Sequence, residues 1–334
     1  MLERNCRMDS SKAIVFGGAG FVGSHFLQRL AKERRYDELF SVDIAQPRFI
    51  VAGVNYKTFD IRLPIPADLC GMGTFHIYNF AAVHTTPGHE DYEYYWANVN
   101  GATNVCRYAS DVGADRIVFT STMMAYGPTE APKGEDDVLE PINAYGRSKI
   151  LAEGIHRLWQ SERADTRRLT IVRPGVIYGL AERGNFTRLS MALKQRRFVY
   201  PARTDTIKAC GYVDDLVSSM IEMEQRNQGV FLYNFCHPER YTIADICGAF
   251  SKATGYPAPR VVVPFWLLGG IAFGFEVLSA LGVKTDINRA RVRKLYQSTN
   301  MVPNRLKEVG FRWQYDLAGG LSAWKKASRM RDFD

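Results

Sequence analysis

The chain has 334 residues, of which 46% are hydrophobic and 23% are charged, as in a globular protein with one large domain or two closely associated ones. The net charge of +8 is compatible with an anionic substrate such as a phosphate ester. The basic residues form no stripe interleaved with aromatic residues, so nucleic acid is not an expected partner.

The six cysteines form no CxxC pair and no His/Cys metal-binding spacing. This usage predicts reduced thiols in a cytoplasmic protein, without a metal site. Residues 1–11 are polar and charged, so no secretory signal is expected there.

Apolar runs alternate with helical patterns through the first half of the chain. The predicted strands are Ala13–Phe16, Leu39–Val42, Val54–Phe59, Ile77–Ala82, Ile117–Thr120 and Thr170–Val172. The predicted helices lie near His25–Lys32, Glu93–Val112 and Ala144–Glu162. This alternation is typical of an α/β fold of the Rossmann type, a doubly wound parallel sheet with helices on both faces. Ligands of such sheets bind at the carboxyl ends of the strands.

A glycine-rich turn joins the first predicted strand to the first predicted helix. Gly17, Gly20 and Gly23 recur at a spacing of three. Such a turn lets backbone N–H groups approach a pyrophosphate and packs the helix closely on the sheet. Asp43 ends the second apolar run, where a carboxylate can accept hydrogen bonds from an adenosine ribose. The order of strand, turn, helix, strand and acid predicts a dinucleotide site.

Three further segments admit two interpretations each. Asp60 follows the third apolar run and is either an adenine contact or a turn residue. The small residues of Asn79–Ala82 permit either close passage of a cofactor or tight packing of a helix. Asn98 lies inside a predicted helix, where a buried amide needs a partner in water, backbone or cofactor.

Tyr145 and Lys149 stand four residues apart at the start of a predicted helix and therefore share one face. A phenol has a pKa of about 10, and a nearby ammonium favours its ionised form. Thr122 follows a predicted strand and can hydrogen-bond the same substrate oxygen. The Tyr-x-x-x-Lys spacing is common on surface helices, but after a dinucleotide turn it favours proton removal from an alcohol while hydride leaves the carbon.

The chain resembles the extended short-chain dehydrogenases/reductases, the NAD-dependent epimerase/dehydratase family. The matching motifs are Gly17–Gly23, Asp43, Asn79–Ala82, Asn98–Asn104, Phe119–Thr122, Tyr126–Gly127, Tyr145 with Lys149, Arg173–Gly179, Tyr212–Leu216 and Asn304–Phe311. The resemblance implies that Thr122, Tyr145 and Lys149 are the catalytic triad, and Asp43 indicates NAD over NADP.

The residues expected to bind NAD are Gly17, Gly20, Phe21, Val22, Gly23, Asp43, Asp60, Ile61, Phe80, Ala81, Ala82, Asn98, Tyr145, Lys149 and Val176.

The residues after Thr122 narrow the reaction. The 4,6-dehydratases of the family carry an Asp-Glu pair there, and this chain has Met123 and Met124, which cannot transfer protons. The Met pair also argues against the epimerase-reductases, which use a Cys and a His. His84 stays open as a candidate base, although a loop histidine is the simpler interpretation. A 4-epimerase and a simple dehydrogenase remain.

The resemblance also predicts a substrate site. Thr122, Asn185, Arg188 and Lys208 are expected to contact a nucleotide-sugar, with Lys208 in the place of a diphosphate-binding arginine. A lysine supplies the charge without the bidentate fork. Val176 stands where many family members have a substrate-binding asparagine, which counts against sugar nucleotides.

An apolar segment, 261–283, contains one charged residue, Glu276. It is interpreted as a packed helix or dimer element, with a membrane-surface contact or a membrane span as alternatives. A similar segment occurs in the 3β-hydroxysteroid dehydrogenase branch of the family, so a lipid-type alcohol dehydrogenase is the alternative function. A dinucleotide-binding sensor or scaffold without turnover is a third.

The favoured interpretation is an NAD-dependent nucleotide-sugar epimerase that acts through a keto-sugar intermediate. Its expected location is the cytoplasm, with association to a membrane as an alternative. Residues 1–180 are expected to form the NAD-binding domain, with 208–240 returning to it, and 181–207 and 241–334 the substrate-binding domain. The family commonly pairs subunits through the helices predicted at 93–112 and 144–162, so a homodimer is expected.

Overall fold

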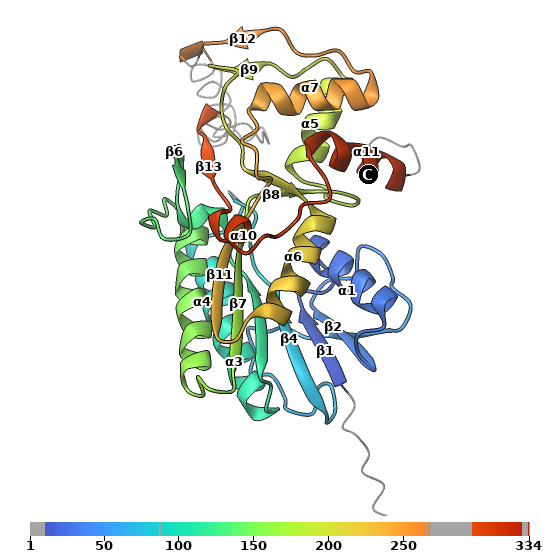
Figure 1. Cartoon of the computed structure of the whole chain (residues 1–334), viewed down its shortest axis with the longest axis vertical. Coiled ribbons are helices and arrows are strands. Elements are labelled where there is room, and N and C mark those ends of the chain that lie inside the picture. The colour runs from blue at the N-terminus through green and yellow to red at the C-terminus, as the bar shows by residue number, and fades with distance from the viewer. Residues whose placement is uncertain (1–10, 87, 265, 268–295, 329–332, 334) are drawn as a thin grey trace, which may run out of the picture. The chain divides into compact units, whose positions relative to one another are not determined.

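The computed structural model describes residues 11–86, 88–264, 266–267, 296–328 and 333 (Figure 1). The chain forms two compact units. The first unit comprises Met1–Ala125, Pro141–Arg173 and Leu216–Tyr233. The second unit comprises Tyr126–Glu140, Pro174–Asp215 and Asn234–Asp334.

A seven-stranded sheet forms the centre of the first unit (Figure 1). Its strands are β1 (Ser11–Phe16), β2 (Glu38–Asp43), β3 (Val54–Thr58), β4 (Thr74–Asn79), β5 (Arg116–Thr120), β7 (Arg168–Pro174) and β11 (Val230–Phe235). Their order is β11-β7-β5-β4-β1-β2-β3, and the sheet is parallel, as predicted. The order reverses between β1 and β4, and this switch point is where open α/β sheets bind ligands.

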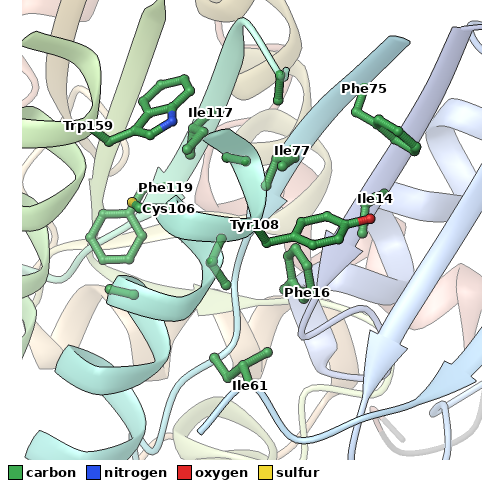
Figure 2. Packing of buried hydrophobic residues seen from close by; sticks show 14 of the residues in the cluster. Ile14, Phe16, Ile61, Phe75, Ile77, Cys106, Tyr108, Ile117, Phe119 and Trp159 are labelled. Carbon is green, nitrogen blue, oxygen red and sulfur yellow. The ribbon is translucent and has the colours of Figure 1, made fainter. Parts of the chain in front are cut away.

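The helices of this sheet are α1 (Phe21–Glu33), α3 (Gly101–Asp111), α4 (Ala144–Ser161) and α6 (Val213–Arg226). Helix α1 begins four residues before the predicted helix, α4 matches its prediction to within one residue, and α6 was not predicted. Figure 2 shows Tyr108 of α3 and Trp159 of α4 among strand residues such as Phe16 and Phe119. The Phe16 and Tyr108 rings meet edge to face, with centroids 5.9 Å apart. Burying these aromatic side chains holds the helices on the sheet and so fixes the start of α4.

The single helix predicted over Glu93–Val112 is interrupted. It consists of α2 (Asp91–Tyr95), a π-helical turn η1 (Trp96–Asn100) and α3. The Asn98 side chain in this turn accepts a hydrogen bond from Val83 N and donates one to Val83 O. A π-turn inserts an extra residue, and here it places a buried amide against the loop after β4.

The second unit is built from short elements. Its strands pair as β6 (Thr129–Lys133) with β13 (Thr299–Met301), β8 (Val176–Tyr178) with β10 (Cys210–Tyr212), and β9 (Tyr200–Pro201) with β12 (Val262–Val263). Its helices are α5 (Asn185–Lys194), α7 (Ile243–Thr254), α10 (Asn304–Glu308) and α11 (Leu317–Ala327).

Two local features hold the helices of this unit. Helix α7 begins at a capping box formed by Thr242 and Asp245. Tyr178 stacks on Phe186 with ring centroids 4.6 Å apart and also meets Trp324. This aromatic cluster joins β8, α5 and α11 into one core.

Most of the apolar segment 261–283 lies outside the described residues. Within the described part of the chain, no helix is long and apolar enough to cross a membrane. Cys70, Cys106, Cys210, Cys236 and Cys247 are buried free thiols.

Candidate cofactor and catalytic site

The glycine-rich turn between β1 and α1 has the geometry that a bound pyrophosphate requires. Gly17 has φ +79°, and a Cβ there would lie 2.5 Å from the backbone N of Ala81. A Cβ on Gly23 would overlap Gly17 O and lie 2.7 Å from Gly18 Cα. Gly20 precedes the first turn of α1, which contains no acidic residue. The turn therefore presents N–H groups and the positive helix end without a side chain that would block or repel an anion.

Asp43 lies at the carboxyl end of β2, beside this turn. One carboxylate oxygen accepts from Ala19 N at 3.1 Å and the other from Ala45 N at 3.0 Å. A carboxylate has about four acceptor positions, so capacity for ribose hydroxyl groups remains.

Asp60 has a different environment, because both of its oxygens accept from Arg62, at 2.6–2.9 Å. This ion pair lowers the pKa of Asp60. The Arg62 guanidinium lies over the Trp96 ring, 4.7 Å from its centroid. Asp60 thus already has a cationic partner, which the sequence pattern did not indicate.

The other predicted cofactor residues of the first unit lie near the carboxyl ends of β1 and β4. Phe21 and Val22 begin α1, Ile61 is buried below α3, and Phe80, Ala81 and Ala82 form the loop after β4. Asn98 links this loop to the catalytic helix, since its amide nitrogen donates to Ser148 Oγ at 2.9 Å. Ser148 stands between Tyr145 and Lys149 and donates to Tyr145 O at 2.9 Å. The cofactor loop and the start of α4 are therefore connected through one buried amide.

Thr122 and Tyr145 come together although they are far apart in sequence. Thr122 follows β5, and Tyr145 lies in the first turn of α4, which Asn143 caps. Burial raises the pKa of Tyr145 to about 12, and the hydrogen bond with the Thr122 side chain acts in the opposite direction. The phenolate is therefore disfavoured by the chain's own surroundings, and its formation requires additional positive charge near the ring.

Lys149 is buried one helical turn beyond Tyr145. Its Nζ lies 4.2 Å from the centroid of the Phe119 ring. Burial lowers the pKa of Lys149 to about 7, whereas the Glu153 carboxylate raises it. The expected lowering of the Tyr145 pKa by Lys149 is not among the effects on the phenol in this structure. Desolvation by burial is the largest effect on both groups, and it destabilises the charged form of each.

Two buried contacts around the triad were not predicted. Glu153 and Arg173 form a bidentate ion pair at 2.8 and 2.7 Å, which ties α4 to β7. His156 stacks on Phe119 with centroids 4.1 Å apart, and its Nε2 lies 3.2 Å from Asn79 Nδ2. In the sequence, the spacing of Glu153 and His156 from Lys149 indicates that they share its face of the helix. This spacing does not indicate which residues they contact.

The expected substrate residues other than Thr122 lie in the second unit, as does Val176 in β8. Asn185 and Arg188 are exposed on the first turn of α5 and hydrogen-bond each other at 2.9 Å. Lys208 is half-buried, and its Nζ donates to Gln297 O at 2.7 Å.

Two further features concern the candidate base His84 and the clusters of possible metal ligands. His84 is exposed in the loop after β4, and its role as a base or as a loop residue stays a prediction. Among the described residues, no cluster of His, Cys, Asp and Glu side chains could hold a metal ion.

Comparison with known proteins places this geometry in a family. The chain is 27% identical to the N-acetyl-alpha-D-glucosaminyl-diphospho-ditrans,octacis-undecaprenol 4-epimerase of Escherichia coli O157:H7, over 93% of each chain. It is 25% identical to the UDP-glucose 4-epimerase of Vibrio cholerae, over 78% of this chain and 82% of the relative. The solved structure of MoeE5 in complex with UDP-glucose and NAD superposes with a TM-score of 0.75 at 17% identity, covering 96% of this chain and 99% of that one.

The model of the "NAD dependent epimerase/dehydratase family" matches residues 13–236, which include the glycine turn, β11 and the expected triad of Thr122, Tyr145 and Lys149. The chain therefore belongs to the NAD-dependent epimerase/dehydratase family, whose members are enzymes with NAD as cofactor.

Proposed function

We propose that the chain is an NAD-dependent 4-epimerase of a diphosphate-linked sugar, with a nucleotide-sugar as substrate. The observation that carries the proposal is the hydrogen-bonded pair of Thr122 and Tyr145, with Lys149 one turn away and Met123 and Met124 beside it. This set can remove a proton from one hydroxyl and offers no acid/base pair at the neighbouring residues for loss of water.

The first unit has the features that NAD requires. The glycine turn leaves room at Gly17 and Gly23, and Asp43 retains acceptor capacity for the ribose. Bound NAD supplies a hydride acceptor and a positively charged ring. We propose that the first unit holds NAD through the predicted residues other than Val176, and that Asn185, Arg188 and Lys208 of the second unit bind the substrate.

Each triad residue has one task in this proposal. Tyr145 takes the proton of the sugar 4-hydroxyl, and Thr122 hydrogen-bonds the same oxygen. Lys149, as an ammonium, supplies charge that favours the phenolate. Return of hydride from bound NADH to the opposite face of the keto-sugar would invert that carbon, and Tyr145 would give the proton back to the oxygen.

The test uses Tyr145→Phe in the full chain with UDP-glucose and UDP-N-acetylglucosamine. Loss of the phenol oxygen is expected to lower kcat by roughly 10²–10⁴-fold while NAD binding is retained. Formation of the 4-epimer is followed by NMR, and NAD binding by calorimetry. Unchanged turnover in Tyr145→Phe refutes the role of the phenol. Net accumulation of NADH with wild-type protein would show a dehydrogenase.

A lipid-linked sugar diphosphate is the second candidate substrate, because the Escherichia coli relative that acts on one matches over 93% of both chains. The second unit also exposes a group of apolar side chains at the start of segment 261–283. Their exposed fractions are 58% for Val261, 44% for Val262, 75% for Trp266 and 41% for Leu267. Exposed tryptophan and aliphatic side chains favour contact with a membrane surface.

Two assays separate these substrates. For a nucleotide-sugar enzyme, UDP or GDP is expected to raise the Tm of the NAD complex, and the protein stays in the supernatant with lipid vesicles. For a lipid-linked substrate, a polyprenyl-diphospho-sugar is turned over and the protein sediments with vesicles, less so for Trp266→Ser. Stabilisation by a sterol alone would instead favour the alcohol dehydrogenase.

A homodimer through α4 is part of the proposal. Leu151 and Leu158 lie seven residues apart on α4 and are 51% and 64% exposed. Tyr92 and Trp96, in α2 and the π-turn, are 65% and 48% exposed. Leu151→Glu with Leu158→Glu is expected to give monomers in light-scattering measurements, and a wild-type chain that is already monomeric refutes this interface.

A further inference from the structure

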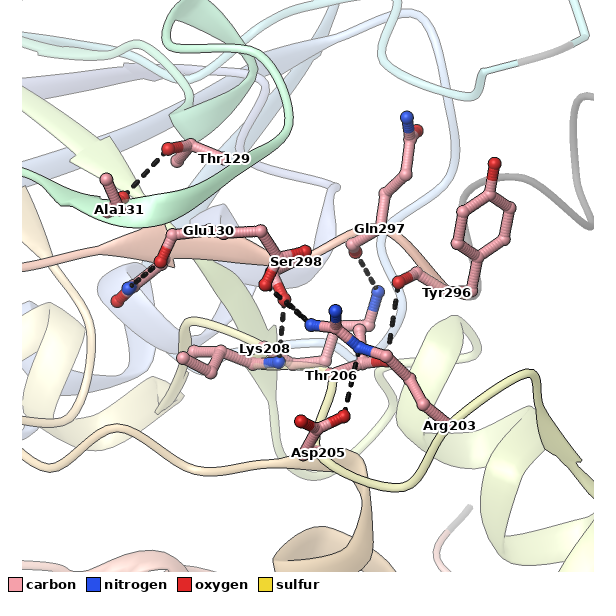
Figure 3. Close-up of polar contacts among 12 residues, drawn as sticks. Thr129, Glu130, Ala131, Arg203, Asp205, Thr206, Lys208, Tyr296, Gln297 and Ser298 are labelled. Atoms are coloured by element: carbon pink, nitrogen blue, oxygen red, sulfur yellow. Dashed lines mark hydrogen bonds and ion pairs between the residues drawn. The ribbon is translucent and has the colours of Figure 1, made fainter. Parts of the chain in front are cut away.

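A network of charged and polar side chains surrounds Arg203 in the second unit (Figure 3). Its guanidinium lies between two carboxylates, with Nη2 2.6 Å from Glu130 Oε2 and Nε 3.0 Å from Asp205 Oδ1. The same guanidinium donates to Ser298 Oγ at 2.9 Å and to Thr206 Oγ1 at 3.3 Å. These four contacts fix the position of a long side chain that would otherwise move freely.

Lys208 lies beside this network, and its backbone is held on both sides. Lys208 N donates to Tyr241 O, Thr299 N donates to Ile207 O, and Lys208 pairs with Thr299. Ile207 N in turn donates to Ser298 Oγ, which also accepts from the guanidinium. The Arg203 network and the Lys208 backbone therefore share one anchor, the Ser298 hydroxyl.

The charge of Lys208 depends on the same two partners. Burial lowers the pKa of Lys208 to about 8, Arg203 lowers it further, and Glu130 raises it. Arg203 belongs to the same segment as Lys208, and Glu130 belongs to β6. The segment 296–299 contributes the Gln297 carbonyl, which accepts from Lys208, and the Ser298 hydroxyl, which accepts from Arg203. Asp205 pairs with Nε of the Arg203 guanidinium.

We propose that Glu130 and Arg203 are positioning residues that set the position and charge state of the Lys208 ammonium for binding the substrate diphosphate. This inference rests on the proposed function, since it takes Lys208 as the diphosphate contact. The carboxylate favours the ammonium and the guanidinium opposes it, so the two variants must act in opposite directions. A network with only a structural role would not give opposite signs.

The measurement is the affinity of the full chain in its NAD complex for UDP, by calorimetry between pH 7 and pH 9.5. The phosphates stay ionised in this range, because a second phosphate pKa lies near 6. Wild-type affinity is expected to fall as pH rises through the pKa of Lys208. Glu130→Gln should begin this loss at lower pH, so that its UDP affinity at pH 8 is about 3–10-fold below that of wild type. Arg203→Leu should delay the loss to higher pH.

Asp205→Asn is the matched control, because Asp205 pairs with the same guanidinium through an exposed carboxylate. Its profile is expected to follow wild type within about twofold at each pH. Each variant is compared with itself across pH, so a general loss of affinity or stability does not imitate the effect. Inorganic pyrophosphate as a second probe shows whether the diphosphate alone, shared by nucleotide and lipid carriers, is enough.

Three outcomes overturn the inference. If Glu130→Gln and Arg203→Leu shift the profile in the same direction, or if both match Asp205→Asn, the network has only a structural role. If Lys208→Met binds UDP and pyrophosphate as tightly as wild type, Lys208 does not contact the diphosphate. Opposite shifts together with no 4-epimer formed would support the inference and refute the proposed function, so the two failures are distinguishable.

Discussion

The Glu153→Gln substitution tests whether the buried ion pair beside the triad holds α4 against the sheet. Glu153 and Arg173 are each 5% exposed, and both carboxylate oxygens accept from the guanidinium. A glutamine keeps one acceptor oxygen and turns an NH₂ group toward the arginine donors. The guanidinium then stays buried without its counter-charge, which costs about 3–5 kcal/mol. A domain of this size loses at least about 6 °C in Tm for such a change.

The assay is urea unfolding followed by circular dichroism, with Glu162→Gln as the control. Arg167 and Glu162 form an ion pair of similar length, 2.8 Å, but the Glu162 side chain is 55% exposed. The control is therefore expected to cost less than about 1 kcal/mol. If the two variants lose the same free energy of unfolding, burial does not increase the contribution of the Glu153–Arg173 pair to stability, and the reasoning is wrong.

Three further predictions concern the site itself. Gly17→Ala should abolish NAD binding because a Cβ there meets the backbone of the loop after β4, whereas Gly53→Ala, with a similar φ of +80° and open space around it, should keep NAD affinity within about twofold. Lys149→Met should abolish turnover yet raise the free energy of unfolding at pH 7 by on the order of 1–4 kcal/mol, because the pKa of Lys149 is lower in the folded state than in the unfolded state. This gain in stability should shrink as pH rises from 7 to 10, and a constant or absent gain contradicts the reasoning. Thr122→Val removes the bond that lowers the pKa of Tyr145, so the pH for half-maximal kcat should rise by about one unit in a pH–rate profile, and an unshifted profile excludes the contact from catalysis.

The sequence by itself determined the features that depend on local spacing. The alternation of apolar runs predicted the parallel sheet, and Gly17, Gly20 and Gly23 predicted the turn between β1 and α1. The separation of four between Tyr145 and Lys149 predicted that both lie on one face of a helix. These patterns succeed because strand and helix periodicity are fixed by backbone geometry, which is the same in every protein.

Only the tertiary structure decided which residues each side chain contacts and how far it is exposed to solvent. The Asn98 amide in the π-turn hydrogen-bonds Val83 and Ser148, and Ser148 is 50 residues away along the chain. The raised pKa of Tyr145 and the lowered pKa of Lys149 come from desolvation by all the surrounding elements. Spacing along one helix contains no information about such surroundings, because burial and long-range contacts arise only when distant segments pack.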